Sequence, residues 1–196
     1  MPYYFILYAV GVGGKTMKIL ILNGSPRLNG NTSFALSAIA EGVSKNTQHC
    51  VEIINAAKLK VGGCTACDAC KTNGGNCIMR DDSRSVIDKI YAADAVIFGT
   101  PVYWWGISAQ LKAVLDKFYS KTAQFKEQNK KIGVIAIGAS AFPSKQYELI
   151  HDQIKCVCDF LGWEMMFGLS FSAAAPDDLK KSEAAVKEIS EVWKKF

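Results

Sequence analysis

Residues 18–33 read Lys18-Ile-Leu-Ile-Leu-Asn-Gly-Ser-Pro-Arg-Leu-Asn-Gly-Asn-Thr-Ser33. The opening run Lys18–Leu22 is short and apolar, which is typical of a parallel strand buried on both faces. Glycine and hydroxyl residues fill the turn that follows the strand. The stretch Thr32–Lys45 then has the pattern of an amphipathic helix, with Asn31 as its predicted N-cap. The segment therefore predicts one strand–turn–helix unit.

This alternation of strand and helix repeats five times between Met17 and the C-terminus. Five such units in about 180 residues predict an α/β fold with a doubly wound five-stranded parallel sheet, in the flavodoxin-like order 2-1-3-4-5. A six-stranded dinucleotide fold would need a Gly-x-Gly-x-x-Gly turn after the first strand, and that turn is absent. The other strands are predicted at Val51–Ile54, Ala95–Gly99, Ile132–Gly138 and Glu164–Ser170, and the other helices at Ser83–Ala92, Ser108–Lys121, Ser144–Leu161 and Asp178–Lys195.

The composition is that of an ordinary globular protein and excludes several classes. Of the 196 residues, 49% are apolar and 21% are charged, with 23 Lys and Arg against 18 Asp and Glu. These values argue against disorder, collagen and coiled coil, and the length suits one domain. The net charge of +5 comes from scattered lysines without a basic face of interleaved aromatics, so nucleic acid is not an expected partner.

The first sixteen residues differ from the rest, because they are apolar and carry no charge before Lys15. The segment is shorter than the roughly 20 residues that span a bilayer, and it lacks the basic start of a secretory signal. We therefore expect no membrane partner. We interpret residues 1–16 as a leader from a misassigned start, or a disordered arm, ahead of one domain over residues 17–196. Ala9–Thr16 resembles a phosphate-binding P-loop, but a strand rather than a helix is predicted after it.

The turn after the first strand has the chemistry of an anion cradle. Its hydroxyl and backbone N–H groups lie between a strand and a helix N-terminus, where anions are stabilised. Gly24 and Gly30 let the backbone approach a ligand closely, and an arginine can bind a phosphate with two parallel hydrogen bonds. The alternative is that these are ordinary turn and cap residues. The candidate donors are Ser25, Arg27, Asn31, Thr32 and Ser33.

The loop after the third strand has aromatic rather than polar character. It contains Tyr103, Trp104 and Trp105, which offer flat apolar surface. In an open parallel sheet, ligands bind beyond the carboxyl ends of the strands at the switch point beside the first strand, and this loop falls there. A phosphate cradle next to a flat platform fits a phosphorylated planar ring, whereas the aromatic loop alone fits a packed loop equally well.

Together the two loops resemble those of the flavodoxin-like FMN oxidoreductases, in particular the NADPH-dependent FMN reductase and iron–sulfur flavoprotein group. The resemblance rests on Gly24-Ser-Pro-Arg-x-x-Gly-Asn-Thr-Ser33 and Gly99-Thr-Pro-Val-Tyr-Trp104, continued by Ser108-Ala-Gln-Leu-Lys112, and it extends from Met17 to the C-terminus. It implies that the cradle donors hold the phosphate and ribityl chain of FMN. It also implies that the flavin ring is lined by Pro101, Val102, Tyr103 and Trp104.

The chain departs from this family pattern at two places. Family members often have a glycine-rich loop after the fourth strand, where this chain reads Gly138-Ala-Ser-Ala-Phe-Pro143. They also often carry arginine at the position of Lys117. The resemblance therefore predicts the contacts of the first two loops better than those of the third.

Four of the seven cysteines fall in an insertion, residues 56–82, between the second strand and the second helix. Their spacing is C-x2-C-x2-C-x6-C, and Gly74-Gly75 lets the chain return to deliver the fourth thiolate. Structural zinc usually uses two separated pairs, whereas three consecutive cysteines at this spacing are typical of ferredoxins. The resemblance implies a [4Fe–4S] cluster, while zinc and metal-free thiols or a disulfide stay open. The candidate metal ligands are Cys64, Cys67, Cys70 and Cys77.

These observations predict an FMN-dependent oxidoreductase in which the flavin carries the chemistry and no side chain is assigned as catalytic. The expected electron donor is NAD(P)H or a ferredoxin-like protein, and the acceptor is a small molecule or a protein. The alternatives are a non-catalytic electron carrier, and a cluster-free flavoprotein whose cysteines bind zinc or stay as thiols. The uneven cysteine pattern favours a reducing compartment, the cytoplasm. The resemblance implies a homodimer or homotetramer in which a cluster lies near a neighbour's flavin.

The remaining candidates have simpler interpretations. Two histidines, His49 and His151, stand apart from each other and from any nucleophile motif, so a hydrolytic triad has no support. The pair Asp81-Asp82 is interpreted as a helix cap and Met165-Met166 as a core strand. Cysteines outside the insertion are expected to be small core residues; these are Cys50, Cys156 and Cys158.

Overall fold

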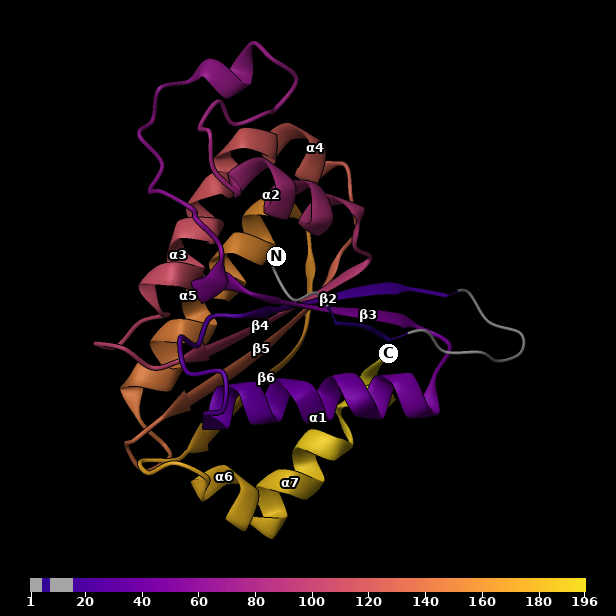
Figure 1. Cartoon of the computed structure of the whole chain (residues 1–196), viewed down its shortest axis with the longest axis vertical. Helices are drawn as coiled ribbons and strands as arrows, with labels where there is room; N and C mark the ends of the chain where they lie inside the picture. The colour runs from indigo at the N-terminus through magenta and orange to yellow at the C-terminus, as the bar shows by residue number, and fades with distance from the viewer. Residues whose placement is uncertain (1–4, 8–15) are drawn as a thin grey trace.

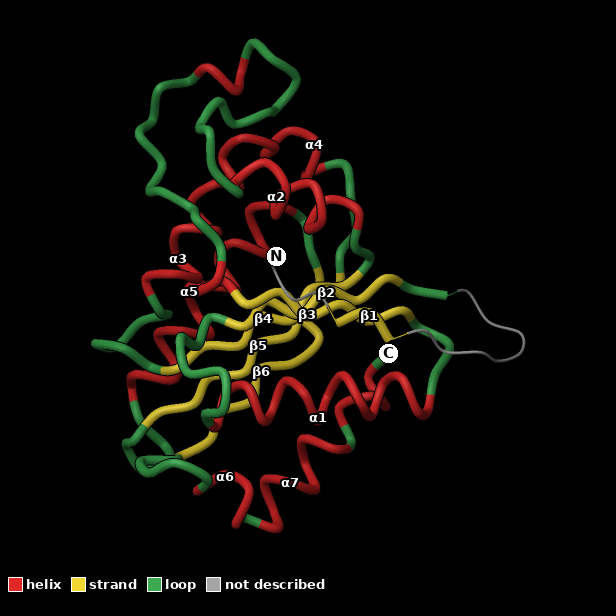
Figure 2. Tube along the Cα trace, viewed as in Figure 1, coloured by secondary structure: helices red, strands yellow, loops and turns green. Residues whose placement is uncertain are grey.

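A computed structural model of the chain describes residues 5–7 and 16–196. Six strands of this part form one sheet in the order β1-β3-β2-β4-β5-β6 (Figures 1 and 2). The pairs among β2 to β6 are all parallel, and β1 pairs antiparallel with β3. The strands are β1 Phe5–Leu7, β2 Lys18–Asn23, β3 Cys50–Asn55, β4 Ala95–Pro101, β5 Lys131–Gly138 and β6 Glu164–Ser172.

The five parallel strands confirm the predicted flavodoxin-like sheet. They correspond to the five predicted strands in chain order, and their arrangement β3-β2-β4-β5-β6 is the order 2-1-3-4-5. At the carboxyl end of the central strand, Asn23 pairs with Asn55 of β3 and with Gly99 of β4. The loops that leave β2 and β4 therefore start side by side, as a ligand site at the switch point requires.

The sequence analysis missed the edge strand β1, which lies inside the segment interpreted as a leader or arm. In the antiparallel register, Phe5 lies opposite Ile53 and Leu7 opposite Val51. Three residues within an unbroken apolar stretch offer no periodicity to read. The P-loop-like pattern Ala9–Thr16 lies outside the described residues, except for Thr16.

Helices cover both faces of the sheet (Figure 1). On one face, α1, α6 and α7 enclose a core that includes Ile21, Leu36 and Ile189, all of them buried. On the other face, α2 to α5 enclose a second core around Phe125 and Ile150. Across residues 5–7 and 16–196, no helix is long and apolar enough to cross a membrane. The α-helices are α1 Asn31–Asn46, α2 Ser83–Ala92, α3 Ala109–Asp116, α4 Thr122–Lys126, α5 Lys145–Leu161, α6 Asp178–Lys181 and α7 Glu183–Ser190, and the 3-10 helices are η1 Ala56–Lys58, η2 Ala69–Lys71, η3 Lys117–Lys121 and η4 Val192–Lys195.

Two helices that were predicted as continuous are broken, so their predicted extents were wrong. The helix predicted over 108–121 stops at Asp116 and continues as the tighter turn η3, which buries Phe118. The helix predicted over 178–195 is interrupted at Ser182, whose backbone is extended and whose hydroxyl accepts from the N–H of Ala185 at 3.3 Å. A serine that bonds to its own backbone in this way starts a new helix instead of continuing the old one.

Candidate functional site

The loops that follow β2 and β4 are joined directly to each other. The N–H of Gly24 donates to the carbonyl of Gly99 at 2.7 Å, and the hydroxyl of Ser108 donates to the carbonyl of Gly24 at 2.6 Å. The same hydroxyl accepts from the N–H of Leu111 and caps α3. A Cβ on Gly24 would lie 2.8 Å from the Ser108 hydroxyl oxygen, so only glycine fits where the loops meet.

A pocket of about 520 Å³ opens beyond the carboxyl ends of the strands, where these loops converge. It combines polar groups from the β2–α1 turn with apolar groups from the loops after β4, β5 and β6. Seven of the nine residues predicted to bind FMN are among its lining residues. The lining consists of Ser25, Arg27, Leu28, Asn29, Gly30, Asn31, Thr32, Pro101, Val102, Tyr103, Ile137, Gly138, Ala139, Ala173, Ala174, Ala175 and Pro176.

The polar end of the pocket is the start of α1. Gly30 is the N-cap of this helix and no side chain caps it, so the predicted cap role of Asn31 is wrong. The uncapped N–H groups of the first turn favour a negative charge. Thr32 is 3% exposed, and its hydroxyl has no hydrogen-bond partner in the described part of the chain. Arg27 is exposed and forms no ion pair with a described carboxylate. These groups fit the phosphate of a nucleotide-like cofactor.

Three of the predicted donors form internal hydrogen bonds. The Ser25 hydroxyl, which lines the pocket, donates to the carbonyl of Arg27 at 3.3 Å. The Asn31 side chain donates to the carbonyl of Ala175 at 3.0 Å and accepts from the N–H of Leu179 at 3.2 Å. The Ser33 hydroxyl donates to the carbonyl of Arg27 at 2.9 Å, and Ser33 does not line the pocket. The side chains of Asn31 and Ser33 therefore hold the turn and the loop after β6 in place, and their contact with FMN stays a prediction.

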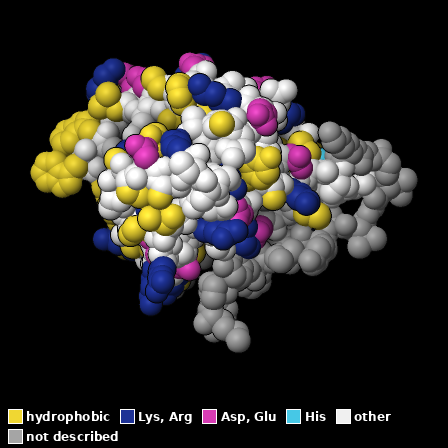
Figure 3. All heavy atoms as spheres, turned by 90° about the horizontal axis from the view of Figure 1, so that it is seen from above, with side chains coloured by type: hydrophobic (Ala, Val, Ile, Leu, Met, Phe, Trp, Pro, Cys, Tyr) yellow, Lys and Arg dark blue, Asp and Glu magenta, His cyan; other side chains and the backbone are white. Residues whose placement is uncertain are grey.

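The apolar end of the pocket is formed by the loop after β4. Pro101, Val102 and Tyr103 line it, whereas Trp104 is 93% exposed and lies outside the lining. Trp104 and Trp105 have left-handed backbones, with φ of 47° and 61°, in a turn closed by hydrogen bonds between Tyr103 and Gly106. Figure 1 shows this loop extending from the body, and Figure 3 shows hydrophobic side chains projecting at the same end. The turn therefore presents both indole rings outward.

Sequence reasoning missed the pocket residues of the last two loops. Gly138 is the last residue of β5, and a Cβ there would lie 2.9 Å from Cγ2 of Val102, so this glycine lets the ends of β4 and β5 approach closely. The hydroxyl of Tyr147 donates to the carbonyl of Ser140 at 2.7 Å and holds the loop after β5. The segment Ala173–Pro176 closes the pocket after β6. Small apolar residues carry no donor signal, and only their position after a parallel strand could have indicated them.

The cysteine insertion docks on η3 and α4, on the side of the sheet away from α6 and α7 (Figure 1). The hydroxyl of Tyr119 donates to the carboxylate of Asp68 at 2.6 Å, and the ammonium of Lys71 donates to the carbonyl of Tyr119 at 2.7 Å. Gly75, with φ of +82°, lies so close to Gln124 that a Cβ would be 2.8 Å from its Nε2. The insertion is therefore folded against the body by specific contacts.

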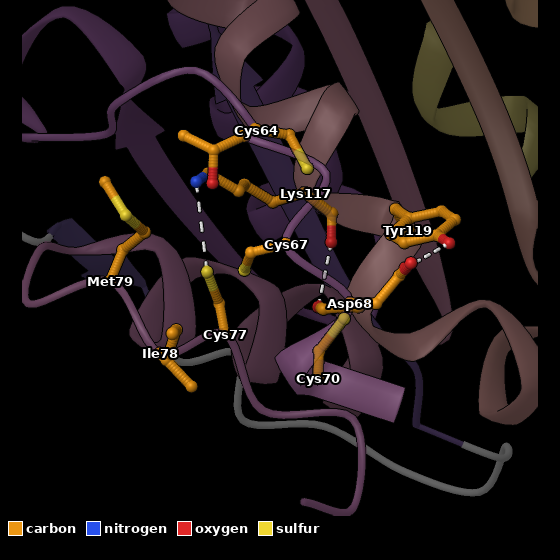
Figure 4. A pocket seen from close by; sticks show the side chains of 11 residues that line it. Cys64, Cys67, Asp68, Cys70, Cys77, Ile78, Met79, Lys117 and Tyr119 are labelled. Atoms are coloured by element: carbon orange, nitrogen blue, oxygen red, sulfur yellow. Dashed lines mark hydrogen bonds between the residues drawn. The ribbon is translucent and has the colours of Figure 1, made fainter. Parts of the chain in front are cut away.

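All four predicted metal ligands, Cys64, Cys67, Cys70 and Cys77, line one small pocket of this insertion (Figure 4). The pKa of Cys67 is lowered, because the N–H of Ala69 and then the hydroxyl of Thr65 hydrogen-bond to its sulfur. In the described residues, no group of three or more Cys, His, Asp or Glu has the arrangement of a metal-ion site. The donor set nevertheless fits a four-thiolate centre in kind and number.

The cysteines outside the insertion have different environments. Cys158 is buried, as predicted, and burial raises the pKa of its thiol to about 11. Cys50 is half-buried and belongs to neither hydrophobic core, so its predicted core position was wrong. Cys156 is exposed, so its predicted core position was wrong. Cys156 lies two residues from the buried Ile154 and Cys158, which is about 200° around the helix, so it faces away from the core.

The remaining polar candidates form structural hydrogen bonds within the chain. The Nδ1 of His49 accepts from the N–H of Met17 at 3.3 Å, and the Nε2 of His151 lies 2.7 Å from the hydroxyl of Ser170. Asp82 is the N-cap residue of α2 and its side chain does not cap the helix, whereas the carboxylate of the preceding Asp81 accepts from the N–H of Ser83, the first residue of α2, at 2.9 Å.

Other bonds from this pair of aspartates close the base of the cysteine insertion. The carboxylate of Asp81 also accepts from the N–H of Gly62 at 2.9 Å, and the carboxylate of Asp82 accepts from the N–H of Lys60 at 2.7 Å. Met165 and Met166 pack against the two cores, as predicted.

The fold and the site together are those of a flavodoxin-like α/β protein. Its pocket at the switch point is lined at one end by the anion-binding N-terminus of α1 and at the other by apolar side chains. Residues 17–163 match the family model of NADPH-dependent FMN reductase. The chain therefore belongs to the NADPH-dependent FMN reductase family, as the resemblance of the two loops predicted.

Individual relatives agree with this assignment. The chain is 39% identical over 129 residues to an iron–sulfur flavoprotein of Methanocaldococcus jannaschii, and this alignment covers 63% of each chain. It is 28% identical over 187 residues to a putative NAD(P)H-dependent FMN-containing oxidoreductase of Bacillus subtilis, covering 91% of this chain and 98% of the relative. An azoreductase structure from Bacillus anthracis has a TM-score of 0.69 at 17% identity, over 92% of this chain and all of that chain, and shows the shared fold.

Proposed function

We propose that this protein is an FMN-dependent oxidoreductase that draws electrons from NAD(P)H and delivers them to a small-molecule or protein acceptor. The proposal rests on one observation: the uncapped start of α1 and the apolar loop after β4 line the same pocket. A phosphorylated flavin has this same division between an anionic end and a flat apolar end. The family assignment and the FMN-containing relative support the proposal.

In this proposal the residues of the chain bind and orient the cofactor. Thr32, Arg27 and the N–H groups of the first turn of α1 hold the phosphate, and Pro101 to Tyr103 position the ring. When bound, FMN supplies the redox chemistry, since it accepts a hydride from reduced nicotinamide and passes electrons on. Among the described lining residues, only Arg27 and Tyr103 carry ionisable side chains, so the chain contributes binding and orientation rather than acid–base chemistry.

The four cysteines are proposed to hold a metal centre. The iron–sulfur flavoprotein relative favours an iron–sulfur cluster, and the resemblance of the cysteine motif implies the [4Fe–4S] form. Zinc or metal-free thiols at the same pocket are the alternatives. Such a cluster supplies one-electron transfer when bound. The cysteine pocket and the FMN pocket share no lining residue, so we propose a homodimer or homotetramer in which one copy's cysteines approach another copy's flavin.

Anaerobic purification followed by a visible spectrum and iron and sulfide analysis tests these proposals. An NAD(P)H enzyme loses its flavin absorbance when pyridine nucleotide is added without oxygen. An electron carrier ignores NAD(P)H and accepts electrons from a reduced ferredoxin, which would overturn the proposed donor. FMN without iron after reconstitution would end the cluster proposal and leave the flavin proposal intact. A cytoplasmic location, favoured by the cysteine pattern, is tested by fractionation of the source cells.

A further inference from the structure

The pocket of four cysteines contains a buried lysine. Lys117 is the first residue of η3 and is 2% exposed, so its ammonium group is removed from water. Lysine is almost never fully buried unless its charge is paired, because transferring an isolated ammonium from water to the interior is strongly unfavourable. This lysine therefore requires a negatively charged partner.

The partners that Lys117 has in the chain are weak. Its Nζ lies 3.4 Å from the carbonyl oxygen of Gly63 and 3.8 Å from the sulfur of Cys77. No carboxylate of residues 16–196 lies within 4 Å of it. The carboxylate of Asp81 is close enough to be attracted by the ammonium, but it forms its hydrogen bonds with the N–H groups of Gly62 and Ser83. Figure 4 shows the Lys117 side chain reaching between Cys64 and Cys77. Of the two groups that the ammonium contacts, only the sulfur of Cys77 can carry a negative charge, so we take this sulfur as its partner.

Neutral thiols do not compensate a buried positive charge, whereas metal-bound thiolates do. A thiol sulfur is a weak acceptor, but a cysteine that binds a metal does so as the thiolate. Four thiolates around zinc or a cubane iron–sulfur cluster leave surplus negative charge at the site, and one-electron reduction of a cluster adds to it. Net charge and hydrogen bonds to the sulfurs are among the factors that set cluster potentials.

We propose that Lys117 is the positioning residue of a thiolate-bound metal centre, and that its ammonium stabilises the anionic sulfur of Cys77. The inference rests on the proposed use of the four cysteines as metal ligands. It predicts that the charge of Lys117 raises both the metal affinity of the cysteine pocket and the reduction potential of a cluster held there. Because the ammonium approaches Cys77 from η3, it acts on the metal through a ligand and not by direct contact.

Cobalt(II) titration of the metal-free, flavin-loaded protein under anaerobic conditions tests the affinity. Thiolate-to-cobalt charge-transfer absorbance reports the binding. We expect Lys117→Met to weaken cobalt binding by about 10- to 100-fold, the loss of one charge-assisted hydrogen bond. Lys117→Arg keeps the charge and is expected to retain most of the affinity. The matched control is Lys121→Met in the same 3-10 helix, since Lys121 is also largely buried and pairs with Asp88 instead of a cysteine.

The potential of the reconstituted cluster gives a second readout that a merely structural role would not change. In an electron paramagnetic resonance titration, Lys117→Met should lower the midpoint potential by about 59 mV, which corresponds to a tenfold shift in a one-electron equilibrium. Lys117→Arg should leave the potential near that of the wild type. If Lys117→Met does not fold, the comparison of Lys117→Gln with Lys117→Arg replaces it.

The outcomes separate this inference from the proposed flavin function. Equal cobalt affinity in wild type and Lys117→Met, or an equal loss in Lys121→Met, would overturn the role of Lys117. A wild-type protein that binds FMN but neither cobalt nor a cluster would also overturn it while the flavin function stands. A protein that binds metal with the expected dependence on Lys117 but takes up no FMN would support the inference and refute the flavin proposal.

Discussion

At the scale of single residues, Ser108 joins the two halves of the pocket. Its hydroxyl donates to the carbonyl of Gly24 and accepts from the N–H of Leu111. Ser108→Ala leaves the buried Gly24 carbonyl without this donor, so we expect the free energy of unfolding to fall by about 1–3 kcal/mol. Urea denaturation measures the change. As a control, Ser190→Ala removes an exposed serine hydroxyl and should change stability by less than about 0.5 kcal/mol. Equal effects of the two substitutions would refute the role of Ser108 in joining the loops.

The phosphate cradle gives a second prediction at this scale. The double substitution Arg27→Ala with Thr32→Ala should weaken FMN binding by about 2–4 kcal/mol, because it removes charge-assisted hydrogen bonds to a phosphate. Flavin fluorescence quenching on titration measures the affinity. Arg84→Ala, which removes an exposed arginine paired with Asp88, should leave it unchanged. An undiminished flavin affinity in the double variant would mean that the phosphate binds elsewhere.

A buried lysine away from both sites makes stability depend on pH. Burial of Lys130 lowers its pKa from 10.5 to about 8, although its ammonium donates to the carbonyls of Tyr91 and Ala93. Between pH 8 and 10.5 the unfolded chain therefore binds more protons at this residue than the folded chain, so stability rises with pH across this window. Relative to Lys130→Met, the wild type should gain at most about 1.4 kcal/mol per pH unit there. Urea denaturation at pH 8 and 9.5 measures this difference; a constant difference would contradict the lowered pKa.

At the scale of elements, the contacts of Tyr119 hold the cysteine insertion on η3. Tyr119→Phe removes the hydrogen bond to the Asp68 carboxylate, and we expect faster proteolytic cleavage within residues 63–77 with little change in global stability. Limited proteolysis followed by mass spectrometry measures the cleavage. Tyr91→Phe, on the neighbouring α2, is the control and should cleave like the wild type. Identical cleavage of all three proteins would show that the hydrogen bond does not order the insertion.

The sequence predicted elements well where their apolar periodicity is strong. All five parallel strands and the helices α1, α2 and α5 were found, because buried strands and amphipathic helices leave clear patterns. The break at Ser182 and the turn η3 were missed, since both depend on local hydrogen bonds and burial that periodicity does not report. The three-residue strand β1 was missed because β3, the strand with which it pairs among the described residues, is distant in sequence.

The candidate site was predictable where its residues have distinctive chemistry. Hydroxyls, an arginine and closely spaced cysteines predict the phosphate cradle and the metal-binding insertion. The small residues of Ala173–Pro176 and the outward turn of Trp104 could not be inferred, because the first have no functional group and the second depends on the left-handed backbone. Lys117 was noted only as a departure from the family pattern, and its burial beside Cys77 becomes visible in three dimensions.

At the scale of the whole molecule, the chain carries two potential redox regions, the pocket beyond the carboxyl ends of the strands and the cysteine insertion. The order of the strands brings the loops after β2 and β4 together at one edge, while the insertion docks on the helices that cover one face. Electron exchange between the regions therefore depends on how copies of the chain associate. We expect sedimentation analysis of the flavin-loaded protein to give a dimer or tetramer, and a monomer at micromolar concentration would contradict this.

The central claim is that the pocket after β2 and β4 binds FMN, and direct titration tests it. The measurement is isothermal calorimetry of the flavin-free protein with FMN, and in parallel with riboflavin, which has the same ring without the phosphate. The account predicts saturable binding of one FMN per chain and markedly weaker binding of riboflavin, because the start of α1 binds the phosphate. A folded protein that takes up no FMN, or that binds riboflavin equally well, would contradict it.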